Sequence, residues 1–144
     1  MAFEKPPAAV IRQLLLDLAL VYSTPTGSQY AARVSSQPES PDRVVTVYDT
    51  GATEDGRLLD TGEVIEHPTV KVRVRGPVYE EAWNKAKEIE LALNGVKRTT
   101  VAVGGVTFRV DNVSSRAPLV LGPDDEERRQ LTVDCNCTIT QTSS

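Results

Sequence analysis

The sequence predicts a single-domain α+β protein with a mostly antiparallel β-sheet and two main helices packed on it. Three observations support this fold class. Two segments carry apolar residues at helical spacing, several β-branched segments alternate apolar and polar residues, and the later of these segments follow one another through tight turns. Consecutive strands joined by hairpins form antiparallel sheets, which place one face against helices and leave the other face polar.

Length and charge limit the function classes. The 144 residues suit one core, so residues 1–144 are expected to form one domain. The net charge of −4 gives no general attraction for nucleic acid. The longest apolar stretch, from Val10 to Val21, contains Arg12 and Asp17 and is shorter than the roughly 20 apolar residues of a bilayer span. Charges inside it also argue against a signal peptide, so neither a membrane nor secretion is expected.

The first predicted helix begins at Pro6 and Pro7, since proline suits a first helical turn, and extends to Val21 and Tyr22. Its apolar stripe is wide, which predicts burial on more than one side. The second predicted helix runs from 77 to 94 and ends at Asn94-Gly95. Its apolar face places two aromatic residues in the core beside four aliphatic ones: Tyr79, Trp83, Ala82, Ala86, Ile89 and Leu93.

The strands are predicted from alternation and from β-branched residues. The predicted ranges are 44–48, 69–75, 99–103, 106–110, 115–121 and a final strand whose apolar face carries Leu131, Val133, Cys135, Cys137 and Ile139. Gly104-Gly105 marks a tight hairpin turn. Between the first two strands, residues 49–68 are polar and glycine-bearing, which predicts a long loop, and loops of this length are often functional.

Few residues suggest a metal or cofactor site. Cys135 and Cys137 lie two residues apart on a strand, where they point the same way at a poor distance for a disulfide. The single histidine, His67, is distant in the sequence and does not complete a metal ligand set. No cofactor and no metal are expected, and the thiols are predicted to be core residues.

One motif suggests catalysis. Asp49-Thr50-Gly51-Ala52 follows a strand, as does the active-site loop of retroviral-type aspartic proteases, in which two aspartates of a dimer share one proton. Val120-Leu121-Gly122 resembles the second element of that family. Against this interpretation, the predicted helix 77–94 lies where an all-β barrel needs strands. A dimeric protease that uses Asp49 therefore stands as the alternative from a different class, and a small-molecule or peptide binding module is a third.

Charge patterning suggests self-assembly. Lys71, Arg73 and Arg75 share one face of a predicted strand, and an acidic run stands later in the chain: Asp124, Asp125, Glu126 and Glu127. The stripe is either a solvated sheet face or a contact for an acidic neighbour. Opposite charges on identical subunits can meet head to tail and close a ring. These seven residues, together with Asp49, are the predicted subunit or partner interface.

The order of these segments resembles a known family. The segments are Val44-Val45-Thr46-Val47-Tyr48-Asp49-Thr50-Gly51, then Pro68, then Val70-Lys71-Val72-Arg73-Val74-Arg75-Gly76, then Tyr79-Glu80-Glu81-Ala82, with Leu119-Val120-Leu121-Gly122 near the end. This arrangement is similar to the tail terminator (minor tail or minor capsid) proteins of long-tailed bacteriophages. Ala52, where relatives often carry glycine, and the poorly matched region 54–66 depart from the family pattern.

The resemblance implies a structural role without catalysis. Members form hexameric rings that cap the tail tube, stop its polymerisation and present a surface to the head. The implied partners are other copies of the chain, the major tail tube protein and a head-side connector or stopper protein. The genome DNA would pass through the lumen without specific binding, and the implied location is the virion, at the head-tail junction, after assembly in the host cytoplasm. A head-tail connector or closure protein is the nearest alternative.

Overall fold

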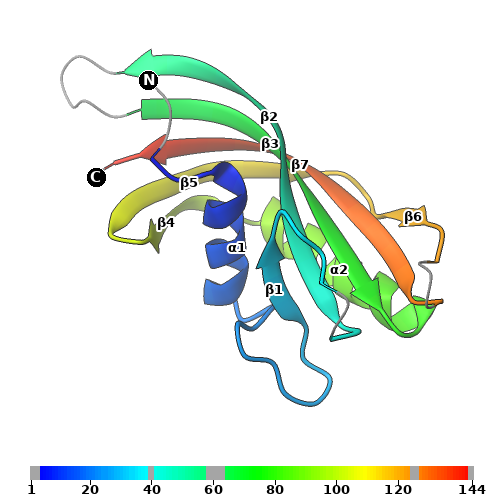
Figure 1. The fold of residues 1–144 in the computed structure, drawn as a ribbon. Helices are drawn as coiled ribbons and strands as arrows, with labels where there is room; N and C mark the ends of the chain where they lie inside the picture. The colour runs from blue at the N-terminus through cyan, green and yellow to red at the C-terminus, as the bar shows by residue number, and fades with distance from the viewer. Residues whose placement is uncertain (1–3, 39–40, 58–63, 124–126, 143–144) are drawn as a thin grey trace.

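The computed structural model describes residues 4–38, 41–57, 64–123 and 127–142. Figure 1 shows a curved sheet with two helices. The elements are, in chain order, α1 (Pro7–Asp17), β1 (Ala31–Val34), β2 (Val44–Arg57), β3 (Val64–Gly76), α2 (Tyr79–Asn94), β4 (Lys97–Val103), β5 (Val106–Ser115), β6 (Leu119–Leu121) and β7 (Arg129–Gln141).

The strands of the described residues form one seven-stranded sheet in the order β1-β2-β3-β7-β5-β4, and β6 pairs with the first part of β7. The β1–β2 pair is parallel and every other pair is antiparallel. The α+β fold class with a mostly antiparallel sheet and two helices is therefore confirmed.

Both helices lie on the same side of the sheet and share one core with it. α2 packs across β3, β7 and β5, while α1 contacts β1, β2 and β4 and so lies between the two ends of the curved sheet (Figure 1). This position explains why α1 is buried on more than one side, through Val10 and Leu14 as well as Ile11 and Leu15. In the described residues, no helix is long and apolar enough to cross a membrane.

The predicted end of the first helix was wrong. α1 ends at Asp17, and Ala19 adopts a φ of +59°, which is outside the right-handed helical region. Val21 is nevertheless buried, and Tyr22 forms a bridge with Ala31 of β1. The apolar pattern therefore continues past the helix because the connecting segment also contributes to the core.

The predicted long loop 49–68 was also wrong. β2 continues to Arg57 and β3 begins at Val64, so most of this segment is a β-hairpin, and residues 58–63 lie outside the described ranges. The register shifts between Asp49 and Gly51 and again between Glu54 and Gly56. Each shift interrupts the two-residue alternation that marks a strand, and the polar composition then looks like a loop.

The later strands largely follow the prediction. β4 and β5 form the hairpin around Gly104-Gly105, whose φ values of +54° and +83° suit the turn that glycines favour. The predicted strand 115–121 is divided, because Ser115 ends β5 and Leu119 begins β6. On β7 the predicted apolar face is confirmed, since Leu131, Val133, Cys135, Cys137 and Ile139 are all buried.

The placement of two aromatic residues in the core was wrong. Trp83 is 38% exposed and Tyr79 is 46% exposed, whereas Ala82 and Ala86 of the same helix are completely buried. The alanines allow α2 to approach the sheet closely, and the large rings lie on the flank of the helix. The fully buried aromatic residue is Phe108 of β5.

Candidate interaction surface on the helix-free face of the sheet

The face of the sheet opposite the two helices carries the three basic residues of β3 that were predicted as part of an interface. Along β3, Val70, Val72 and Val74 are buried in the core, whereas Lys71 and Arg73 are partly exposed on the other side. The alternation predicted for this strand is therefore confirmed as far as Arg73. We call the side away from the helices the helix-free face.

Arg75 differs from the other two basic residues of β3. Its side chain is 2% exposed, and its guanidinium donates hydrogen bonds to the backbone carbonyls of Asp42 (3.2 Å) and Pro41 (2.5 Å). Both carbonyls belong to the crossover that joins the parallel strands β1 and β2. Arg128 reaches the same segment, with 3.2 Å between its Nη1 and Oδ1 of Asp42. The prediction that Arg75 is part of an open basic stripe was wrong, because this residue anchors the crossover inside the subunit.

Two further cations join Lys71 and Arg73 on the helix-free face. Arg33 of β1 pairs with Thr46, which pairs with Arg73, so these residues share one row across the sheet. Arg116 follows β5, and its backbone N–H donates to the carbonyl of Asp134. Sequence reasoning missed both cations. Arg33 lies in a strand of only four residues, and Arg116, inside the predicted strand 115–121, lies where that strand is interrupted between β5 and β6.

A hollow of about 260 Å³ opens beside Lys71. Its polar lining comes from four segments that are distant in the sequence: Thr50, Thr69, Lys71, Arg116, Asp134 and Asn136. The rim is ordered by a hydrogen bond of 2.8 Å from Thr50 Oγ1 to Thr69 Oγ1. Asp134 pairs with Lys71 in the strand register, and it is the carboxylate of this hollow.

Arg73 lies between the hollow and the crossover. Its guanidinium carbon is 5.2 Å from the centre of the Tyr48 ring, a distance at which a cation is attracted to an aromatic face. Its Nε is buried without a hydrogen-bond partner in the described residues, and so is Oγ1 of the fully buried Thr46 beside it. These two polar atoms therefore have no hydrogen bond to any residue that the structure describes.

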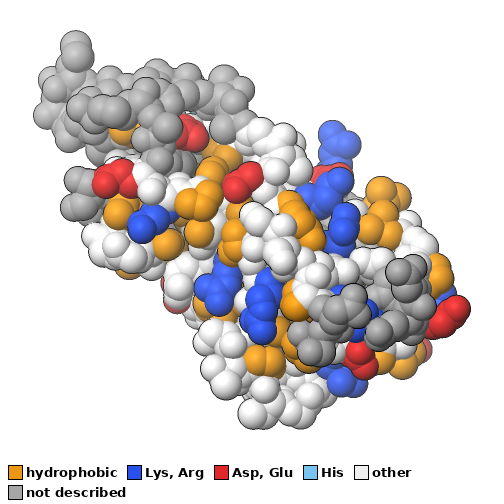
Figure 2. Space-filling view, in the orientation of Figure 1, with side chains coloured by type: hydrophobic (Ala, Val, Ile, Leu, Met, Phe, Trp, Pro, Cys, Tyr) orange, Lys and Arg blue, Asp and Glu red, His pale blue; other side chains and the backbone are white. Residues whose placement is uncertain are grey.

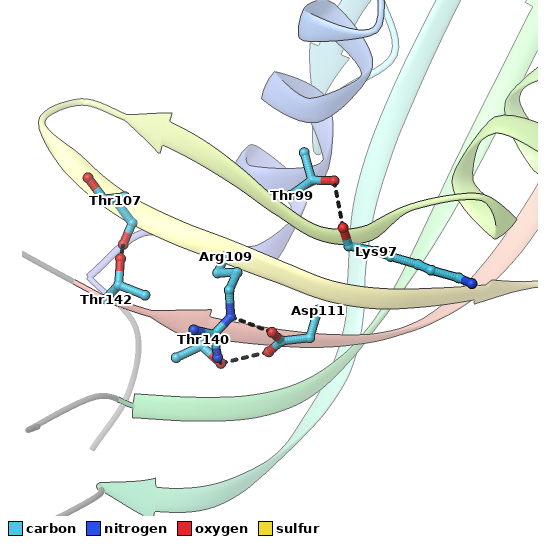
Figure 3. A network of polar contacts seen from close by, with 7 residues as sticks. All are labelled: Lys97, Thr99, Thr107, Arg109, Asp111, Thr140 and Thr142. Atoms are coloured by element: carbon cyan, nitrogen blue, oxygen red, sulfur yellow. Dashed lines mark hydrogen bonds and ion pairs between the residues drawn. The ribbon is translucent and has the colours of Figure 1, made fainter. Parts of the chain in front are cut away.

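At the other end of the helix-free face, a basic side chain is paired within the subunit (Figure 3). Arg109 Nε lies 2.5 Å from Asp111 Oδ1, and Thr140 Oγ1 donates to Asp111 Oδ2 at 2.7 Å. A register shift in the β5–β7 pair falls between Val110 and Asn112, at Asp111. This network is therefore close to neutral, unlike the part of the face around Lys71.

Asp49, the aspartate of the protease-like motif, has a structural contact. Its Oδ1 accepts a hydrogen bond of 2.8 Å from the backbone N–H of Ala8 in the first turn of α1. Pro6 occupies the cap position of this helix and makes no side-chain cap hydrogen bond. A carboxylate is favourable there because the free N–H groups carry partial positive charge. Asp49 thus caps α1 from a distant part of the chain. In the sequence, α2 stands between Asp49 and β6, where a protease barrel would need strands.

Replacing Asp49 with alanine should therefore lower the free energy of unfolding by about 1 kcal/mol, as expected for the loss of a helix cap. Chemical denaturation followed by circular dichroism would measure the change. Asp49→Asn is the matched variant, since its side-chain oxygen can still accept the hydrogen bond from Ala8, and it should lose less stability. An equally large loss for both variants would contradict the capping role.

The other predicted interface residues are described only in part. Asp124, Asp125 and Glu126 lie outside the described ranges, while Glu127 is exposed and has a φ of +64°. Large apolar side chains are also exposed at the start of α2 (Val78, Tyr79 and Trp83) and on β6 (Leu119 and Val120). Exposed apolar side chains, where they gather into a patch, mark surfaces that contact other proteins.

The two cysteines are core residues. Burial raises the pKa of Cys135 to about 11 and that of Cys137 to about 12, so both thiols stay protonated near neutral pH. Both are free cysteines. Within the described ranges, no group of three or more His, Cys, Asp or Glu side chains is placed to hold a metal ion.

Comparison with known proteins identifies the family. The family model described as bacteriophage tail terminator protein matches residues 15–141, which is most of the chain. A chain in the solved structure of the virion of a native gene transfer agent particle is similar, with a TM-score of 0.49 and 15% identity over 92% of each chain. No curated protein matches the sequence. Because the family model covers far more than half of the chain, the protein belongs to the bacteriophage tail terminator proteins, which are structural components of the virion tail.

Proposed function

We propose that copies of this chain close into a ring, expected to hold six subunits, which caps the tail tube, ends its polymerisation and joins the tail to the head. The observation that carries this proposal is the family match over residues 15–141. The fold adds support, because helices cover only one side of the sheet, and apolar side chains of α2 and β6 are exposed. Such surfaces are available to other copies, to the major tail tube protein and to a head-side connector or stopper protein.

The net charge is compatible with a conduit for DNA. Each chain carries −4, so a ring of six would carry about −24. A negative ring does not retain a passing polyanion, whereas proteins that bind DNA neutralise its phosphates with basic residues. The genome would then pass through the lumen without specific binding.

The deciding experiment compares tails made with and without this protein. Tails assembled without it should be longer than normal and variable in length, and supplying the protein should restore the normal length. Electron microscopy of negatively stained tails measures the length and also shows whether a ring stands at the end of the tube. The purified protein, studied by light scattering, would show whether the ring forms before it meets the tube.

The nearest alternative gives a different result. If the protein were a connector or closure protein of the head, tails made without it would keep their normal length and would fail only to join heads. Tails of normal length would therefore reject the proposed termination role while leaving a role at the head-tail junction.

A further inference from the structure

We infer that the helix-free face is the docking surface for the next copy of this chain, whose acidic surface meets the cations around the hollow beside Lys71. This inference rests on the proposed ring and adds to it the face that binds the neighbour. The cations are Arg33, Lys71, Arg73 and Arg116, and we call them the basic cluster.

The first argument is the uneven distribution of charge. Lys71 and Arg116 line the hollow together with one carboxylate, that of Asp134, and Arg33 and Arg73 share a row of the same face, although the whole chain carries −4. The rest of the molecule is therefore more negative than the chain as a whole. Exposed carboxylates lie away from this face, such as Asp17 at the end of α1 and Glu80 on α2. Figure 2 shows Lys and Arg side chains across the middle of the visible surface, with Asp and Glu mainly towards its two ends.

The second argument is that two cations of the basic cluster have no ion-pair partner among the described residues. Neither Lys71 nor Arg116 forms an ion pair with any residue that the structure describes. Arg73 keeps a buried Nε, and the neighbouring Thr46 a buried hydroxyl, without hydrogen bonds to described residues. Buried polar groups are normally paired, and leaving one unpaired is costly. Carboxylates of a neighbour would supply ion-pair partners for the accessible side chains of Lys71 and Arg116.

The third argument concerns the chemistry of the partner. Leu119 is 60% exposed, and it shares a row of the sheet with Thr132 and Arg73. An apolar side chain of a neighbouring protein would bury Leu119, whereas a nucleic acid phosphate would gain nothing from it. The face therefore suits an acidic protein surface better than DNA.

The positive charge of the basic cluster also favours a head-to-tail contact between copies over a symmetric one. Two copies that met through the same face about a two-fold axis would place one basic cluster against the other, and the cations would repel. A contact between this face and the acidic side of the next copy has opposite charges on the two sides. Such head-to-tail contacts close into rings when the rotation between copies allows it. The charge distribution is therefore compatible with the proposed ring and disfavours a symmetric dimer.

The test compares a variant with two reversed charges at the hollow with a control variant that has two reversed charges elsewhere. The double variant Lys71→Glu with Arg116→Glu reverses the two cations that form no ion pair with a described residue. The matched control, Lys97→Glu with Arg98→Glu, makes the same change of net charge on exposed residues of β4. Rings would be counted by light scattering of the purified full chain and by electron microscopy at the ends of tail tubes. Thermal unfolding of each variant shows whether the fold is retained.

The expected result is a loss of rings by about tenfold or more in the hollow variant, with wild-type numbers in the control. Wild-type rings should also weaken when NaCl is raised from about 0.1 M to about 1 M, since salt screens exposed charges. Equal ring numbers in both variants, whether both high or both low, would overturn the inference. So would tighter binding of duplex DNA by wild-type rings than by the hollow variant at unchanged ring number.

Failure of the inference can be told apart from failure of the proposed function. If wild-type tails end in rings and the hollow variant forms them equally well, termination stands and the neighbour docks on another face. If tails made without the protein have normal length, the proposed function itself is wrong. If the hollow variant fails to fold, the single variants Lys71→Gln and Arg116→Gln carry the same test, because they remove each charge without reversing it.

Discussion

Phe108→Ala should lower the free energy of unfolding by about 3–5 kcal/mol, whereas Trp83→Ala should change it by about 1 kcal/mol or less. Phe108 is completely buried in the core, and its removal leaves a cavity that the curved sheet cannot easily close. Trp83 is 38% exposed, so much of its ring gains little from folding. A domain of this size is stable by only about 5–15 kcal/mol, so the first loss would be a large part of the total.

Urea denaturation followed by far-ultraviolet circular dichroism would measure both changes. Ile89→Val is a useful third variant, because it removes one methyl group from the same core and should cost about 0.5–1.5 kcal/mol. A Trp83→Ala loss that equals the Phe108→Ala loss would show that the tryptophan is a core residue after all. Trp83→Ala should instead affect contacts with other proteins, since its ring is one of the large apolar side chains that the fold leaves exposed.

The contrast between Trp83 and the buried residues of the same helix shows how far helical periodicity can be used. The period placed Ala82, Ala86, Ile89 and Leu93 correctly, because residues three and four apart share one side of a helix. It could not decide how wide the buried stripe is. The width depends on how closely α2 approaches the sheet, and the small alanines that bring it close also leave the flanking ring of Trp83 exposed.

The β2–β3 hairpin shows a second limit. Strand alternation predicted Val70, Val72 and Val74 as core residues because the register there is regular. Beyond Asp49 the register shifts, the polar sequence loses its period, and the segment was mistaken for a loop. No pattern within a polar segment shows that the segment is hydrogen-bonded to a neighbouring strand. For the same reason, the sequence could not show that Asp49 would cap a helix that starts 42 residues earlier.

The basic face was predictable only in its simplest part. Alternation placed Lys71 and Arg73 together, since residues two apart on a strand point to the same side. Arg75 follows the same alternation, but the crossover between β1 and β2 covers it. The alternation of residues in a strand does not predict the path of the connections around it. Arg33 lies on this face because β1 pairs with β2, and Arg116 because the chain after β5 runs alongside β7. Both placements depend on the order of strands in the whole fold.

Arg75 and Lys71 should consequently behave in opposite ways when each is replaced by methionine. Arg75→Met removes a buried guanidinium that donates to the carbonyls of Pro41 and Asp42, so the free energy of unfolding should fall by about 2–4 kcal/mol. Lys71→Met leaves the crossover untouched and should change stability by about 0.5 kcal/mol or less. Methionine keeps much of the length of both side chains, so the comparison isolates the charge and its hydrogen bonds.

Measured together, stability and assembly separate the two roles. Lys71→Met should retain a wild-type melting temperature and form fewer rings, because it removes a cation that forms no ion pair with any described residue. Arg75→Met should melt at a lower temperature, and at temperatures where it is folded its ring number should fall less than that of Lys71→Met. If Arg75→Met were as stable as wild type and unable to form rings, Arg75 would be part of the docking surface, and the assignment of this residue to the crossover would have to be given up.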